Sequence, residues 1–566
     1  MPSALAYLAR AVLVSAMLSL PGAVAASSLS GAYLAAMQAD FRDDYADAAA
    51  YYDQALAIDP ENVGLMINAV VVQVALGDVA SARTIADRLE AADARNQIAT
   101  LVRLADALAA GDFTRAGAVL GAAGEETVNP LLGGLLAGWI EVGREDFPAA
   151  SARFDAMTGN DALAAYGQYH KALALAFAGD FVGAAAILEG GEEGPLHLNR
   201  AAIVAHAQVL AQIGREDDAV ALLDEALAGG VPDAPIIALR DRLAAGEEVP
   251  FDQVTRPRDG AAEAFLTLAD ALNGEDSERV ALVHARLAAH IRPDLAEAQL
   301  LAADLLEAQE QFELASAALS SIPETSPWYV SAQVRLADTQ RAAGDADAGI
   351  ATLTALAASN QDRIEVDSAL GDALRIAERF PEAAAAYGKA IDKIDTPRQA
   401  HWVLYYTRGI ASERAGDWPG AEADFRKALE LEPGQPLVLN YLGYSMVEKH
   451  ENLDEALGMI EDAVRAQPDD GYITDSLGWV LYRLGRYEEA VPHMLRAVEL
   501  TPDDPVINDH LGVVLWKVGR TREAEFQWRR ALSFGPADDL DMDRIRRKLE
   551  GGLDRELAAE QDRQDG

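Results

Sequence analysis

The stretch DSLGWVLYRLGRYEEA, which spans Asp475–Ala490, returns 34 residues later as DHLGVVLWKVGRTREA over Asp509–Ala524. The two copies align on Gly478 and Gly512, and small or apolar residues hold the equivalent place upstream, mostly at intervals of 34 or 35 residues. Self-similarity at a fixed period of this length is the signature of a repeat architecture. The upstream positions are Ala36, Val70, Leu104, Gly138, Ala172, Ala207, Leu268, Ala302, Ala337, Gly371, Gly409 and Gly443.

Two intervals break the period. One is 38 residues long, where Ile394–Pro397 is inserted, and the other is 61 residues long, from Ala207 to Leu268. The region 229–262 inside the longer interval is rich in Gly and Pro, which mark turns and loops. It predicts an irregular linker or hinge with one helix, from Pro235 to Ala245.

Within one unit, apolar residues recur at three- and four-residue spacing, as on one face of a helix. Gly485 and Arg486 supply a turn between two such helices, and Pro502 ends the second helix because it lacks an N–H donor. Helices this short gain their core only by stacking on neighbours. The sequence therefore predicts an all-α stack of helix pairs. The apolar positions of the unit are Leu477, Val480, Leu481, Leu484, Val491, Met494 and Val498.

The pattern resembles the tetratricopeptide repeat, a 34-residue helix–turn–helix unit with small residues at positions 8, 20 and 27 and Pro at position 32. The resemblance covers almost all of the chain after the N-terminal segment. It implies a right-handed superhelical solenoid of roughly fourteen units in two segments. The matching residues are Gly478, Ala490, Ala497 and Pro502, then Gly512, Ala524, Ala531 and Pro536.

Residues 1–25 are typical of a secretory signal peptide. Arg10 supplies a positive charge, Ala11–Leu20 is an apolar run too short to span a bilayer, and Ala23–Ala25 offers a small-x-small cleavage pattern. We therefore expect an exported, soluble periplasmic protein. The chain has no Cys to carry a lipid, which excludes a lipoprotein anchor.

These observations divide the chain into six predicted parts. They are a signal peptide (1–25), a degenerate N-terminal repeat block (26–228), the irregular linker (229–262), a middle repeat block (263–395), a C-terminal block that follows the consensus (396–536), and a capping helix with a tail (537–566).

Composition excludes several function classes. The hydrophobic fraction of 50% is that of a folded protein, and the net charge of -44 disfavours binding to nucleic acid. Without cysteines there is no disulfide, thiol nucleophile or Cys-based metal site. No His-Glu-x-x-His helix and no phosphate-binding Gly loop occurs. We expect no catalytic residue, metal or cofactor. The negative charge is expected to keep the protein soluble, with attraction of basic partners as the alternative role.

The resemblance implies where a partner would bind. In tetratricopeptide repeats, positions 2, 5, 6, 9, 12 and 13 of the first helix face a bound peptide. Here they combine aromatic rings with polar tips, a composition that suits buried peptide contacts. Packing between repeats is the alternative role of Trp479, Tyr482 and Trp516. The predicted groove residues are Tyr406, Asn440, Tyr444, Tyr472, Asp475, Trp479, Tyr482, Arg483, Asp509, His510, Trp516 and Lys517.

Residues 396–536 also resemble a family of exported proteobacterial tetratricopeptide proteins related to the lipoprotein adaptor of a periplasmic carboxy-terminal processing protease. The runs Asn440–Tyr444, Asp475–Trp479 and His510–Gly512 carry this likeness. It implies a non-enzymatic adaptor that brings a protease and cell-wall hydrolases together, although the missing lipid-bearing Cys departs from that relative. The alternatives are an assembly factor for the biosynthesis or secretion of an envelope polymer and, from another class, an enzyme.

Overall fold

A computed structural model describes the chain at residues 28–123, 128–157, 161–190, 196, 199–228, 233–274, 277–535 and 540–564. Over these residues the chain forms helices joined by turns, with no strand, and the predicted all-α fold is confirmed. The predicted signal peptide (1–25), Gly229, Gly230 and Pro536 lie outside the described residues.

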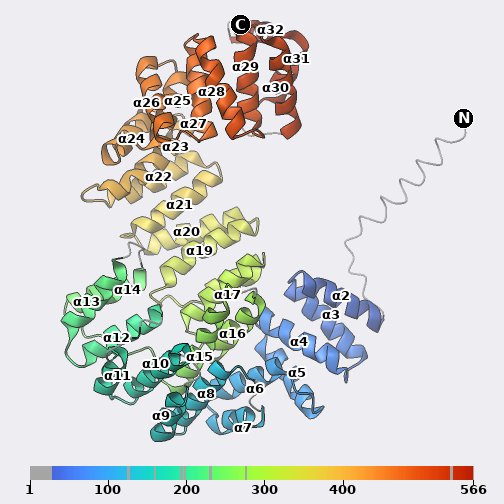
Figure 1. Cartoon of the computed structure of the whole chain (residues 1–566), viewed down its shortest axis with the longest axis vertical. Coiled ribbons are helices and arrows are strands. Elements are labelled where there is room, and N and C mark those ends of the chain that lie inside the picture. The colour runs from blue at the N-terminus through green and yellow to red at the C-terminus, as the bar shows by residue number, and fades with distance from the viewer. Residues whose placement is uncertain are drawn as a thin grey trace, which may run out of the picture. The chain divides into compact units, whose positions relative to one another are not determined.

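The chain divides into two compact units, Met1–Thr352 and Leu353–Gly566, called here the N-terminal and C-terminal units. The helices of the N-terminal unit follow one another along the chain (Figure 1). They are α2 (Leu29–Phe41), α3 (Tyr45–Ile58), α4 (Val63–Leu76), α5 (Val79–Ala91), α6 (Gln97–Ala109), α7 (Phe113–Ala123), α8 (Pro130–Gly143), α9 (Phe147–Asp155), α10 (Asp161–Phe177), α11 (Phe181–Leu188), α12 (Arg200–Gln212), α13 (Glu216–Leu227), α14 (Ala234–Ala244), α15 (Pro257–Leu272), α16 (Glu278–Ile291), α17 (Ala296–Ala308), α18 (Phe312–Ser320) and α19 (Tyr329–Ala342).

The boundary between the units falls inside α20 (Ala346–Ser359). The helices of the C-terminal unit are α21 (Ile364–Ile376), α22 (Phe380–Asp392), the short 3-10 helix η1 (Gln399–His401), α23 (Trp402–Arg414), α24 (Trp418–Leu431), α25 (Pro436–Glu448), α26 (Leu453–Ala466), α27 (Gly471–Arg483), α28 (Tyr487–Leu500), α29 (Pro505–Lys517), α30 (Thr521–Phe534), α31 (Met542–Gly551) and α32 (Leu553–Gln564).

Each repeat is a pair of adjacent helices, of which we call the first the A helix and the second the B helix. The residue at position 8 of the A helix lies where the two helices touch. A Cβ atom added to Gly371 would lie 2.6 Å from the ring of Tyr387, and one added to Gly409 would lie 2.7 Å from the ring of Phe425. Because a larger residue would clash there, position 8 must be small wherever the B helix offers a large side chain.

The predicted 34-residue period is confirmed in both units. The position-8 residues lie on the A helices α2, α4, α6, α8, α10, α12, α15, α17, α19, α21, α23, α25, α27 and α29. From Ala36 and Val70 to Leu268 and Ala302, they are buried in the core of the N-terminal unit. The degenerate N-terminal repeats therefore keep the same packing contact with different residues.

The turn between the A and B helices uses the left-handed backbone region. Gly485 and Gly519 adopt φ values of 76° and 80° there, which glycine reaches without a steric penalty. In other repeats the same turn places Glu145, Glu310 or Glu378 at a positive φ. Those turns are strained relative to glycine, so the stacked helices must hold them in place.

The helix pair α15–α16 departs from a simple stack. It packs against the A helices α8, α6 and α4, which precede it by more than 100 residues (Figure 1). A Cβ atom on Gly260 would lie 2.2 Å from the ring of Trp139, and Arg258 donates to the carbonyl of Ala109 at 2.7 Å. Almost every residue of α15 from Asp259 to Ala269 is buried, as expected of a helix enclosed on all sides.

The predicted linker, 229–262, is accordingly structured over much of its length. It contains α14, which matches the helix expected from Pro235 to Ala245, and the first turn of the enclosed helix α15. The segment lies inside the N-terminal unit, where the α15–α16 pair that follows α14 folds back onto α4, α6 and α8.

We predict that Gly409→Ala lowers the free energy of unfolding of the C-terminal unit by about 1–3 kcal/mol, because the new methyl group overlaps the ring of Phe425. Chemical denaturation followed by circular dichroism measures the change. Adding Phe425→Leu should recover at least about 0.5 kcal/mol of the Gly409→Ala penalty. The matched control is Gly458→Ala in α26, where no atom lies within 4 Å of the added Cβ and the substitution should be neutral or stabilising. Equal losses at both glycines would contradict the packing argument.

Candidate partner-binding surface

The predicted groove residues come from four successive A helices of the C-terminal unit, α23, α25, α27 and α29. The faces of these helices that carry the predicted groove residues are called here the A-helix surface. The predicted residues fall into three groups: those that link α27 to the repeats beside it, those that contact the C-terminal helices, and the remainder, which are partly or largely exposed.

The first group links α27 to α29. His510 Nδ1 donates to Asp475 Oδ2 at 2.8 Å, and the imidazole stacks on the indole of Trp479 with ring centroids 3.9 Å apart and an angle of 16°. Tyr482 also stacks on that indole, with ring centroids 4.8 Å apart. Trp479 is only 9% exposed, so its ring serves the contact between repeats in this structure.

The charge balance at His510 follows from this packing. Burial alone would lower the pKa of His510, but the carboxylates of Asp475 and Asp509 outweigh it and raise the pKa above its usual value. Lys548 opposes that rise. The imidazolium and the Asp475 carboxylate therefore form a charge-assisted pair under mildly acidic conditions.

A second contact joins α25 to α27 through Glu448. Its carboxylate accepts from Trp479 Nε1 at 2.9 Å and from Arg483 Nη1 at 3.0 Å. Arg483 Nη2 donates to His450 Nε2 at 2.8 Å. Arg483, like Trp479, is thus engaged by the preceding repeat.

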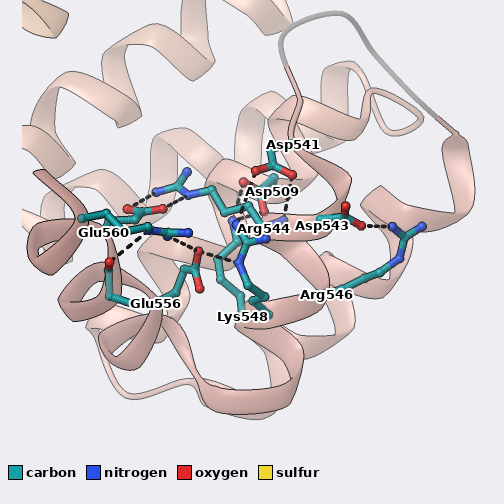
Figure 2. Close-up of polar contacts among 11 residues, drawn as sticks. Asp509, Asp541, Asp543, Arg544, Arg546, Lys548, Glu556 and Glu560 are labelled. Carbon is teal, nitrogen blue, oxygen red and sulfur yellow. Dashed lines mark hydrogen bonds and ion pairs between the residues drawn. The ribbon is translucent and has the colours of Figure 1, made fainter.

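The second group lies under the C-terminal helices α31 and α32. Lys548 Nζ donates to both carboxylate oxygens of Asp509, at 2.5 and 2.6 Å (Figure 2). Asp554 accepts from Trp516 Nε1 at 3.1 Å and from Lys517 Nζ at 2.6 Å. Asp509, Trp516 and Lys517 are therefore satisfied within the chain.

The third group keeps part of its surface exposed. Tyr472 is 60% exposed, and Tyr406, Asn440 and Tyr444 are partly exposed. Among the described residues, none donates to the Oδ1 atom of Asn440, which is itself buried. Tyr406 packs its ring 6.1 Å from that of Tyr441, at nearly a right angle.

Sequence reasoning missed two exposed residues of this surface. Val403 and Leu437 are 43% and 44% exposed, and each is the second residue of its A helix, as Tyr472 is in α27. The three side chains share the second position of α23, α25 and α27 and are called here the apolar row. The signal for them was their shared repeat position, since they differ in residue type.

A separate cavity of about 510 Å³ lies in the N-terminal unit, and sequence reasoning missed it as well. Burial and the charges of Glu297 and Asp270 raise the pKa of Glu263 to about 7. Burial and Glu297 raise the pKa of Asp270 to about 6. The charged residues that line this cavity come from α12, α15, α17 and α19, and they are Arg200, Glu263, Asp270, Glu297, Asp304 and Arg335.

Within the described parts of the chain, no group of three or more His, Cys, Asp or Glu side chains is placed to hold a metal ion. None of the helices there is both long and apolar enough to cross a membrane.

We predict that Glu263→Gln stabilises the N-terminal unit by about 1–3 kcal/mol near pH 8 and has little effect near pH 4. The folded-state pKa of Glu263 is raised, so folding favours the protonated form and wild-type stability falls as pH rises from about 4.5 to 7. Thermal unfolding of both proteins at the two pH values measures the difference. An equal shift at both would show that ionisation of Glu263 is not the cause.

Comparison with known proteins supports the repeat assignment. Family models described as "Tetratricopeptide repeat" match residues 42–105, 402–435 and 448–505, and a model described as "Tetratricopeptide repeat-like domain" matches residues 252–404.

Among curated proteins, a TPR repeat-containing protein of Pseudomonas aeruginosa is 37% identical over 87 residues, which is 15% of each chain. The match therefore spans a small part of that relative's length. Among solved structures, a tetratricopeptide repeat protein from Parabacteroides merdae has 15% identity and a TM-score of 0.37, covering 45% of this chain and 97% of its own. A chain of the APC/C hetero-tetramer Cut9–Hcn1 has 15% identity and a TM-score of 0.36, covering 93% and 97%. YrrB, described as a TPR protein with an unusual peptide-binding site, has 16% identity and a TM-score of 0.27, covering 31% and 88%.

Proposed function

Because the chain is a tetratricopeptide-repeat protein, we propose that it is a non-enzymatic scaffold whose C-terminal unit binds a protein or an extended peptide on the A-helix surface. Tetratricopeptide repeats generally mediate contacts between proteins, and the fold is typically non-catalytic. The exposed side chains of Val403, Leu437 and Tyr472 support a role in binding.

The observation that carries the proposal is the apolar row Val403, Leu437 and Tyr472. Three exposed side chains of this size share one position in three successive repeats, whereas scattered exposed apolar residues are ordinary. An extended peptide could pack its side chains on the row.

The N-terminal unit is a weaker candidate for this role. Its A helices α4, α6 and α8 are covered by the chain's own α15–α16 pair. These contacts reduce the surface that the three helices could offer a partner, and we restrict the proposed partner site to the C-terminal unit.

We further propose that the protein is exported to the periplasm, where the partner is a protease together with its cell-wall hydrolase substrates. The character of residues 1–25 supports export, and the likeness of residues 396–536 to exported adaptor proteins supports the partner class. The absence of Cys supports function without a lipid anchor.

We predict that the double variant Leu437→Ser plus Tyr472→Ser weakens partner binding by about tenfold or more, because it removes two side chains from the row. Both residues are exposed, so the fold should be preserved to within about 0.5 kcal/mol. The measurement is recovery of partners from envelope extract, followed by titration of the recovered partner against each variant.

The matched control is Leu495→Ser plus Phe526→Ser, which removes exposed apolar residues from the B helices α28 and α30. This control should bind as the wild type does. Full binding by the A-helix variant would refute the surface assignment. Recovery of polymer synthases or secretion pores in place of protease and hydrolases would redirect the function to envelope polymer assembly.

Export predicts a processed N-terminus. The mature protein recovered from the periplasm should begin at Ala26, because cleavage is expected after Ala25. Intact-mass measurement of the protein from fractionated cells tests this. A cytoplasmic protein that retains residues 1–25 would contradict export.

A further inference from the structure

The helices α31 and α32 form an antiparallel pair, called here the C-terminal hairpin, that rests on the last A helix. Arg544 pairs with Glu560, and Arg547 with Glu556, so the two helices are joined by their own ion pairs (Figure 2). The hairpin contacts Asp509, Trp516 and Lys517, three of the predicted groove residues. It therefore covers the last A helix, α29, as α29 itself covers Asp475 and Trp479 of α27.

Polar contacts make up much of this attachment. Ile545 and Leu553 are the fully buried apolar side chains of the hairpin, and Leu549 and Leu557 are partly buried against the same core, while most of its other residues are charged. The repeat beneath it, α29–α30, buries Leu511, Val514 and Trp528 with several others. Since apolar burial supplies most of the stability of a helix pair, the hairpin is held less strongly than a repeat.

We propose that the C-terminal hairpin is an exchangeable occupant of the A-helix surface, and that a partner helix bearing a lysine for Asp509 and a carboxylate for Lys517 and Trp516 displaces it. This inference rests on the proposed function and names the partner chemistry and the regulation of the same surface.

The requirement for lysine comes from burial. Lys548 Nζ bonds to both oxygens of Asp509 and lies 5.5 Å from the centre of the Trp528 ring, with no part of its side chain exposed. Asp509 is itself only 4% exposed. An apolar occupant would leave that carboxylate buried without a counter-charge, which is strongly unfavourable. The occupant must therefore bring its own cation.

The connection between α30 and α31 lets the hairpin control a partner's access to the A-helix surface. α30 ends at Phe534 and α31 begins at Met542, so a displaced hairpin stays tethered close to its site. A short tether gives an effective concentration of about millimolar. A partner must compete with this internal copy, and it binds only when its contacts extend beyond those of the hairpin, for example onto the open row at Tyr472.

The test uses a fluorescent peptide of residues 540–564 as the probe and the full-length chain as the receptor. Lys548→Met weakens the internal hairpin but keeps Asp509, so this chain should bind the peptide about tenfold or more tightly than the wild type. Asp509→Asn also weakens the hairpin but removes the receptor carboxylate, so it should bind about tenfold less tightly than Lys548→Met. A peptide carrying Lys548→Met should lose binding to the same extent.

Several outcomes would overturn the proposal. One is equal binding by the Lys548→Met and Asp509→Asn chains, as expected if the hairpin were only a structural cap. Another is unchanged hydrogen-exchange protection of residues 542–564 in Lys548→Met. A third is a wild-type dimer in which two copies exchange their hairpins, because a second copy of this chain, and not a different partner, would then displace the hairpin.

A milder variant guards against misfolding. Asp554→Asn keeps the buried Lys548 pair and removes only the contacts to Trp516 and Lys517. It should increase peptide binding by a smaller factor, about threefold, and no increase would count against exchange. The probe is the chain's own sequence, so loss of partner capture with peptide exchange intact would overturn the proposed function alone.

Discussion

The close approach of two helices at one small residue is the constraint on which the rest of this structure depends. At Gly371 and Gly409 the A helix leaves room for a ring from the B helix and for nothing else. That contact sets how the two helices of a pair meet, and each pair can then stack on the next in the same way. Equivalent residues of successive repeats consequently fall in rows, and the exposed row Val403, Leu437 and Tyr472 is one of them.

The repeat period was enough to predict the helices and much of their core, because the position-8 contact leaves a mark at regular intervals. The position of α15–α16 was not predictable from that mark. A small residue at position 8 is needed whether a pair continues the stack or folds back against earlier repeats. What distinguishes α15 is that nearly all its faces are buried, and the run Gly260, Ala261, Ala262 and Ala264 shows this only when the surrounding helices are known.

The candidate surface divides in a similar way. Sequence placed the predicted residues on the A helices, and the structure has them there. Which of them remain open depends on contacts between repeats. Asp475 pairs with a residue 35 positions on, whereas Asp509 pairs with one 39 positions on, since the segment before α31 is longer. The sequence pattern of a single repeat includes neither His510 nor Lys548, the partners of these two carboxylates. Positions that contact another helix and positions that stay exposed therefore look alike in the sequence.

The enclosed pair α15–α16 also makes the two units different kinds of folding problem. Tyr45 on α3 donates a hydrogen bond to Gln309, 264 residues away, and α16 lies against α4. Contacts between residues so far apart in the sequence form only after the ends of a long loop have met. This requirement slows folding and couples distant segments into one cooperative step. In the C-terminal unit, most contacts join neighbouring repeats. Its repeats can therefore fold or unfold one after another from an end. An unfolding force or a protease would therefore meet an all-or-none barrier in one half of the chain and a progressive one in the other.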